Sequence, residues 1–186
     1  MFIQTEATPN PATLKFLPGR DVMGDKPSRD FANSDRADAS PLAAALFQVA
    51  DVCGVFFGAD FIAVTKAKGE WQHLKPSVLG VIMDHFTNDA ALFLDPDEGE
   101  SSITEDDDEV VAQIKELLDT RVRPAVAQDG GDIVFSDFDK SSGVVYLHMR
   151  GACAGCPSAT MTLQSGIENL LKHYVPEVSR VEPALA

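Results

Sequence analysis

A run of acidic residues near the middle of the chain constrains the fold more than any other feature. Eight residues between Asp95 and Asp108 are acidic and none is basic, so this run carries −8 of the net charge of −14. Such a segment buries little apolar surface and is typical of a solvated linker. We therefore expect two small α+β domains, residues 1–92 and 107–186, joined by an acidic flexible linker at 93–106. A docking segment for a basic partner is the alternative interpretation of the run.

The composition limits where such a chain works and what it binds. Of its 186 residues, 45% are hydrophobic, which is enough for a core in each domain. No apolar run approaches the roughly 18 residues of a membrane span, so no membrane partner is expected. The net negative charge argues against nucleic acid as a partner, because phosphate binding needs clustered Lys and Arg. The start, Met1–Glu6, resembles neither a signal nor a transit peptide. We expect a bacterial cytoplasmic protein, with a mature mitochondrial matrix protein as the alternative.

The first domain is predicted to have the order ββαββα. Ser40 followed by Pro41 is typical of a helix start, with the serine as cap and the proline in the first turn. The predicted elements are strands at Phe2–Glu6 and Leu14–Phe16, a surface loop at 20–39, a helix from Pro41, a hairpin of Val52–Phe57 and Phe61–Lys66, and a helix opened by Pro76. Cys53 lies in the apolar hairpin and is expected to be buried. No active site is visible in this domain.

The second domain is predicted to have the order αββαβ. Apolar residues at helical spacing indicate an amphipathic helix at 107–120, which Pro124 stops or kinks. The sequence Asp129-Gly130-Gly131-Asp132 predicts a turn with unusual backbone angles. The remaining predicted elements are hairpin strands at Ile133–Phe138 and Val144–Met149, a helix at Thr160–Tyr174 and a short edge strand at Val178–Val181.

Two cysteines, Cys153 and Cys156, form a CxxC pair between a predicted strand and a predicted helix. Pro157 suits the first helical position, which puts Cys156 at the N-cap, where free backbone N–H groups lower a thiol pKa. Gly151 and Gly155 allow the loop to bring amide groups near the sulfurs, where they can donate hydrogen bonds to metal-bound sulfur. The pair therefore indicates thiolate chemistry.

Three functions are compatible with this pair. A thiol–disulfide oxidoreductase also places CxxC between a strand and a helix, although in a larger domain of different element order. Structural zinc needs four ligands, and neither a second CxxC nor a histidine pair is available, since His148 and His173 are isolated. An iron–sulfur cluster held between two chains needs only two cysteines from each.

Both halves of the chain resemble known domains. Residues 107–184 resemble the NifU C-terminal domain, and the residues that carry this likeness are Arg123-Pro124, Asp129-Gly130-Gly131-Asp132 and Gly151-Ala152-Cys153-Ala154-Gly155-Cys156-Pro157-Ser158. The first domain resembles the Nfu N-terminal domain through Phe2-Ile3-Gln4-Thr5, Thr8-Pro9-Asn10-Pro11, Leu14-Lys15-Phe16, Val55-Phe56-Phe57-Gly58 and Phe61-Ile62. The two together look like an Nfu-type iron–sulfur cluster scaffold or carrier.

The resemblance implies a function, a cofactor and partners. A [4Fe–4S] cluster would be shared between two chains, with Cys153 and Cys156 of each as its metal ligands, so that a homodimer forms on cluster binding. The cluster would come from an upstream assembly scaffold and pass to apo iron–sulfur proteins. The N-terminal domain would modulate partner contact and would not bind the cluster. No general acid, nucleophile triad or phosphate loop is visible, so we expect no enzyme activity.

Overall fold

The computed structural model describes residues 1–94, 108–153 and 157–184, without the side chains of 157–159. Most of the predicted acidic linker and Cys156 therefore lie outside the described residues. None of the described helices is long and apolar enough to cross a lipid bilayer.

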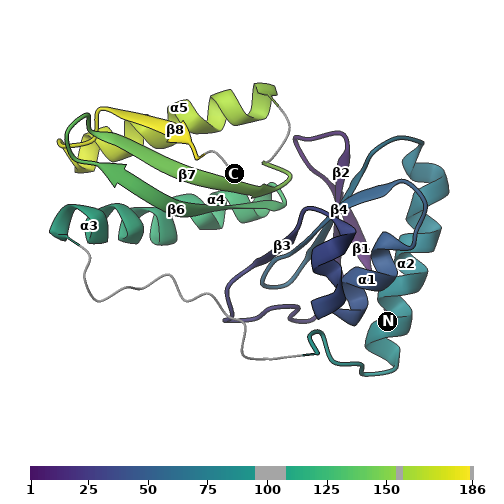
Figure 1. The fold of residues 1–186 in the computed structure, drawn as a ribbon. Helices are drawn as coiled ribbons and strands as arrows, with labels where there is room; N and C mark the ends of the chain where they lie inside the picture. Colours follow the sequence, from purple (N-terminus) through teal and green to yellow (C-terminus); the bar gives the residue numbers. More distant parts are fainter. Residues whose placement is uncertain (95–107, 154–156, 185–186) are drawn as a thin grey trace. The chain divides into compact units, whose positions relative to one another are not determined.

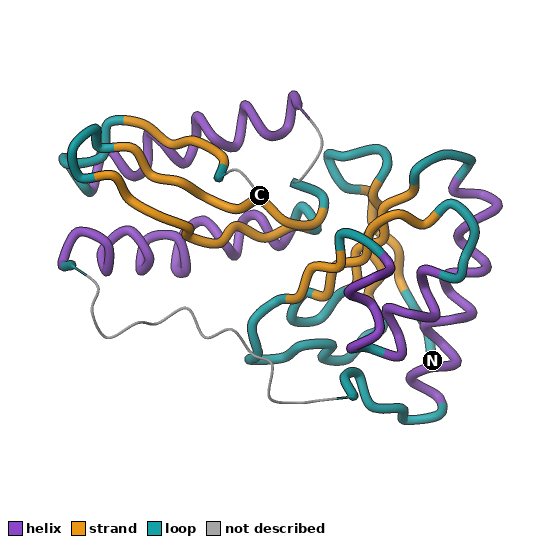
Figure 2. The backbone as a smooth tube through the Cα atoms, in the orientation of Figure 1, coloured by secondary structure: helices purple, strands orange, loops and turns teal. Residues whose placement is uncertain are grey.

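The chain divides into two compact units, Met1–Ser101 and Ser102–Ala186 (Figure 1). Each combines one β-sheet, drawn in orange, with helices drawn in purple (Figure 2). The predicted α+β class with two small units is confirmed.

The first unit is built on one five-stranded antiparallel sheet of order β1-β2-β5-β4-β3. Its elements are β1 (Gln4–Ala7), β2 (Thr13–Leu17), β3 (Arg29–Phe31), the 3₁₀ helix η1 (Ser34–Ala39), α1 (Pro41–Phe47), β4 (Val52–Phe57), β5 (Ile62–Lys66) and α2 (Trp71–Thr87). The predicted start of α1 is confirmed, because the Ser40 hydroxyl accepts a hydrogen bond from the Ala43 amide at 3.3 Å. The same hydroxyl donates to the Leu92 carbonyl at 2.6 Å.

The predicted surface loop at 20–39 is wrong in part. This segment contains β3 and η1, and three of its apolar residues, Met23, Phe31 and Ala37, belong to the buried core of the unit. These residues have no helical or strand spacing, so pattern reasoning misses them. Each is buried by contacts with distant residues rather than by a local amphipathic face.

The second helix of this unit begins five residues before Pro76, the residue that was predicted to open it. Pro76 lies inside α2, which starts at Trp71. The first turn is held by a tertiary contact: the Trp71 indole N–H donates to the Pro11 carbonyl at 3.2 Å, and its ring packs edge-on against Phe16.

The prediction that Cys53 is buried is wrong, because its side chain is exposed. The pairing of β4 with β5 shifts register between Val52 and Gly54. A β-bulge at this point leaves one residue out of the ladder, so alternation along the strand fails to place Cys53.

The second unit has the predicted order of elements around a three-stranded sheet, β6-β7-β8. Its elements are α3 (Glu109–Leu117), the π-helical turn η2 (Leu118–Val122), α4 (Arg123–Gln128), β6 (Gly131–Asp139), β7 (Val144–Gly151), α5 (Pro157–Tyr174) and β8 (Arg180–Pro183). β6 and β7 form the predicted hairpin. β8 pairs with β7 in parallel, because α5 carries the chain back along the sheet as a crossover.

The first helical segment of this unit does not end near residue 120 but continues to Gln128. The π-helical turn η2 interrupts it just before Arg123 and Pro124. A proline disrupts the regular hydrogen-bond ladder, and a widened turn is one way in which a helix accommodates it. The predicted stop is therefore absent, and a π-helical turn lies at this point of the helix instead.

One apolar core binds all these elements together. It contains Ile114 and Leu118 from the first helical segment, Val145 and Leu147 from β7, and Ile167 from α5. Cys153 is also part of this core. The end of β7 and the middle of α5 therefore pack on the same core.

Candidate metal centre

Cys153 lies two residues after the end of β7 and is fixed by hydrogen bonds of its neighbours. Its side chain is buried, with 6% of the residue exposed. The Ala152 amide donates to the Gly130 carbonyl at 3.2 Å. The Thr160 hydroxyl, from the first turn of α5, donates to the Cys153 carbonyl at 3.0 Å. The loop is thus tied both to the turn before β6 and to α5.

Glycine is required at two adjacent positions where β6 begins, for a different structural reason at each. Gly130 adopts φ 78°, in the left-handed region that favours glycine, as the sequence predicts. Gly131 lies against Cys153: a Cβ atom at this position would be 2.5 Å from the Cys153 Sγ and 2.8 Å from the Arg150 carbonyl oxygen. Only a residue without a side chain allows the sulfur to occupy this position.

Asp132, the residue after Gly131, forms a partly buried ion pair with Arg123. The Arg123 Nε lies 2.9 Å from the Asp132 Oδ1, and its Nη2 lies 3.0 Å from Oδ2, so the contact is bidentate. Asp132 is 4% exposed, and its Oδ1 also accepts the Ile133 amide at 2.8 Å. Arg123 makes a further contact, 3.1 Å, to the exposed Asp119. The pair fastens α4 to the start of β6, directly beside Gly131.

Electrostatics at Cys153 favour the protonated thiol. Burial raises the pKa of Cys153 to about 12, and the negative charges of Asp129 and Asp132 add to this shift. The carboxylate of Asp132 in turn raises the pKa of Arg123, so that the guanidinium stays charged. A thiol in this environment is a poor nucleophile until a metal ion replaces its proton.

The second cysteine of the pair is Cys156. Cys156 lies outside the described residues, so its predicted N-cap position stays a prediction. α5 begins at Pro157, as the sequence predicts. Within the described part of the chain, no group of three or more His, Cys, Asp or Glu side chains is arranged to hold a metal ion.

Both units match family models. The model described as scaffold protein Nfu/NifU N terminal matches residues 3–89, and the NifU-like domain model matches residues 114–182. A NifU-like protein 5, mitochondrial, from Arabidopsis thaliana is 52% identical over 98% of this chain and 67% of the relative. The chain belongs to the Nfu/NifU family.

Other relatives of this Nfu/NifU chain have similar names. An NFU1 iron-sulfur cluster scaffold homolog, mitochondrial, from Drosophila sechellia is 53% identical over 98% of this chain and 64% of the relative. The chain thus spans just under two thirds of the length of that relative. A solution NMR structure of a NifU-like protein from Saccharomyces cerevisiae is 24% identical, with a TM-score of 0.46, over 50% of this chain and 85% of that one.

In this Nfu/NifU chain the sequence predicts the two cysteines as ligands, but it does not predict which residues lie around Cys153. Arg123, Gly131 and Asp132 occur in the motifs that carry the family resemblance, yet no local pattern joins Arg123 to Asp132 or Gly131 to Cys153. The one sequence signal for the contact between Gly131 and Cys153 was the pair of adjacent glycines, because a turn needs only one residue with a left-handed backbone. A second glycine indicates close approach of another group.

Proposed function

We propose that the chain is an iron–sulfur cluster scaffold or carrier. In this proposal a [4Fe–4S] cluster is the cargo, held between two copies of the chain by Cys153 and Cys156 of each. Family membership and the names of the relatives support a role with iron–sulfur clusters. The CxxC pair supplies two thiolates, and a two-fold axis through the site completes the four that such a cluster needs.

The residues around Cys153 fit a thiolate ligand for such a cargo. Gly131 leaves space for the sulfur, and the bonds from Ala152 and Thr160 hold the backbone of the loop. When the cluster binds, the Cys153 thiol loses its proton, so cluster binding releases protons. Holding the cargo by two ligands per chain lets thiolates of a recipient replace them one at a time, which favours transfer.

The environment of Cys153 is the observation that favours cluster binding over thiol–disulfide exchange. The attacking cysteine of a redox CxxC pair is accessible and has a lowered pKa. Cys153 is buried, and burial raises the pKa of its thiol. The oxidoreductase remains the second candidate, because its CxxC lies between a strand and a helix as this one does.

The partners of the scaffold follow from the same proposal. An upstream assembly scaffold donates the cluster and apo iron–sulfur proteins receive it, while neither nucleic acid nor membrane takes part. The chain holds and transfers its cargo without catalysing a reaction. Residues 1–92 act as a domain that modulates partner contact, with 93–106 as the linker to residues 107–186. We keep the bacterial cytoplasm as the expected location, and the names of the mitochondrial relatives support the mitochondrial alternative.

Anaerobic reconstitution of the full chain with iron and sulfide tests the proposal. The expected product contains about four irons and four sulfides per two chains and is dimeric. Cys153→Ala and Cys156→Ala should each abolish cluster binding and cluster-dependent dimerisation. Cys53→Ala is the matched control and should retain both, because Cys53 is the remaining cysteine and belongs to the first unit.

Two results would contradict the proposal. A full cluster in either the Cys153 or the Cys156 variant would refute the assignment of ligands. A cluster-free monomer that cycles one disulfide with a thiol reductant would favour the oxidoreductase instead. Visible absorbance together with the iron content distinguishes these outcomes from zinc binding.

A further inference from the structure

A pocket lies at the end of the second unit that is remote from Cys153. β6 runs from Gly131, which contacts Cys153, to Asp139, which precedes the pocket residue Lys140. The eight steps between these two strand residues, at about 3.3 Å each, separate the two ends by roughly 26 Å. A molecule bound in the pocket would therefore leave the cysteine loop free.

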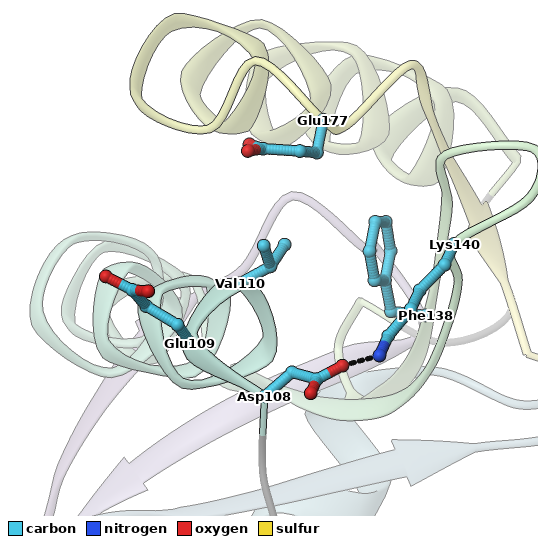
Figure 3. Close-up of a pocket in the computed structure, with 6 residues that line it drawn as sticks. All are labelled: Asp108, Glu109, Val110, Phe138, Lys140 and Glu177. Carbon is cyan, nitrogen blue, oxygen red and sulfur yellow. Dashed lines mark ion pairs between the residues drawn. The ribbon is translucent and has the colours of Figure 1, made fainter.

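The pocket combines an apolar floor with a charged rim. Val110 from α3 and Phe138 from β6 supply the apolar surface, and the rim consists of Asp108, Glu109, Lys140 and Glu177 (Figure 3). Its volume of about 310 Å³ is at the lower end of the range for small-molecule pockets, about 300–1,000 Å³. A single long side chain suits this space better than a folded element.

The charges of the rim are unequally paired. Lys140 forms an ion pair with Asp108. The carboxylates of Glu109 and Glu177 have no hydrogen-bond or ion-pair partner in the described parts of the chain. Both lie on the side of the pocket away from the Lys140 amine (Figure 3). Two unpaired carboxylates beside apolar surface favour a cation with an apolar stem.

The hairpin loop that carries Lys140 is held in place before any partner arrives. The Asp139 carboxylate accepts bonds from the Ser141 amide, the Ser141 hydroxyl and the Ser142 hydroxyl at 2.9, 2.6 and 2.8 Å. The Ser179 hydroxyl, from the segment that follows Glu177, donates to the Ser142 carbonyl at 2.5 Å. These bonds fix two walls of the pocket relative to each other, which lowers the entropy lost on binding.

We propose that this pocket binds an arginine side chain from a basic segment of a partner protein. The aliphatic stem would pack on Val110 and the guanidinium would stack on Phe138. Its N–H groups would donate to the carboxylates of Glu109 and Glu177, as guanidinium groups do in charge-assisted pairs.

An NMR titration tests this site. The full apo chain is labelled with ¹⁵N and titrated with a blocked peptide of sequence Gly-Leu-Arg-Gly. Amide signals of Glu109, Val110, Phe138 and Glu177 should shift, with saturation in the millimolar range. The same peptide with citrulline in place of arginine keeps the shape but lacks the charge, and it should cause no such shifts. The titration is independent of cluster binding, so its result does not depend on the function proposed above.

Two variants that each remove one negative charge distinguish binding in the pocket from non-specific electrostatic attraction of the peptide. Glu177→Gln should lower the affinity for the arginine peptide about two- to fivefold, which is the effect of losing one exposed ion pair. Glu116→Gln, on the same unit but outside the pocket, should leave the affinity unchanged. The proposal is overturned by an absence of shifts in the millimolar range, by equal binding of the citrulline peptide, or by equal effects of the two variants.

Discussion

Gly131 and Cys153 lie so close that a single methyl group on the glycine would meet the cysteine sulfur at 2.5 Å. This contact joins the first residue of β6 to the loop after β7. The position of the sulfur therefore depends on a residue more than twenty positions away in the sequence.

Replacement of this glycine should disturb both folding and cluster binding. In Gly131→Ala the new methyl also meets the Arg150 carbonyl oxygen at 2.8 Å and the Cys153 amide at 3.1 Å. Backbone atoms cannot rotate away, so we expect a loss of about 1–3 kcal/mol in the free energy of unfolding. The cluster content after reconstitution should also fall. Urea unfolding and iron analysis measure the two effects.

Gly166→Ala is the matched control for that substitution. Gly166 lies within α5, and a methyl group there meets no atom within 4 Å. Because alanine favours a helix over glycine by up to about 1 kcal/mol, this variant should be as stable as the wild type or more so. Equal behaviour of the two alanine variants would show that the contact at Cys153 has no structural importance.

The ion pair between Arg123 and Asp132 should contribute strongly to stability. Arg123→Met removes the bidentate partner of an aspartate that is 4% exposed. Asp132 keeps the hydrogen bond from the Ile133 amide, so loss of the charged partner should cost about 1–3 kcal/mol and shift unfolding to lower urea concentration. Asp119→Asn removes only the exposed contact of the same arginine and should cost less than about 1 kcal/mol. Similar losses in the two variants would refute this ranking.

The thiol of Cys153 should make the apo protein less stable at alkaline pH. Burial and the charges of Asp129 and Asp132 raise its pKa from 9.0 to about 12. Between these values the unfolded chain holds fewer protons at this thiol than the folded chain does. The contribution of this thiol to the free energy of unfolding is therefore fully present below about pH 9. It falls as the pH rises, by at most about 1.4 kcal/mol per pH unit.

The contribution of this thiol can be isolated by substitution. Cys153→Ser removes the titrating group, so its free energy of unfolding should decline less between about pH 8 and about pH 10 than that of the wild type. Urea unfolding of both proteins under reducing conditions gives the comparison. If the free energy of unfolding depended on pH in the same way in both proteins, the pKa of the thiol would not be shifted by its surroundings.

The outer edge of β8 should depend on two side chains of α5. The Gln164 side-chain amide donates to the Val181 carbonyl, and the Val181 amide donates to the Glu168 carboxylate at 3.2 Å. Glu168→Ala frees this amide, so its hydrogen exchange, measured by NMR, should accelerate. Glu177→Ala removes an acid that contacts no β8 amide and serves as the control. Unchanged protection of Val181 in the Glu168 variant would contradict this role.

The predictable part of the fold rested on local rules. Ser40 and Pro41 mark a helix start because capping involves neighbours three residues apart. Gly130 marks a turn because its own backbone angle requires glycine. The exceptions are Cys53, where the pairing of β4 with β5 shifts register, and Trp71, whose early helix start is held by a contact to Pro11. No residue nearby in sequence signals those contacts.

Local sequence patterns predict the two-unit α+β organisation, the order of elements in the second unit and the CxxC pair that marks its candidate site. These follow from hydrophobic spacing, charge and turn residues, which act over a few positions. The folded chain adds that Cys153 is buried against Gly131, that Arg123 pairs with Asp132 and that β8 runs parallel to β7. Each of these depends on packing between segments far apart in the chain, where available space and burial determine which groups meet.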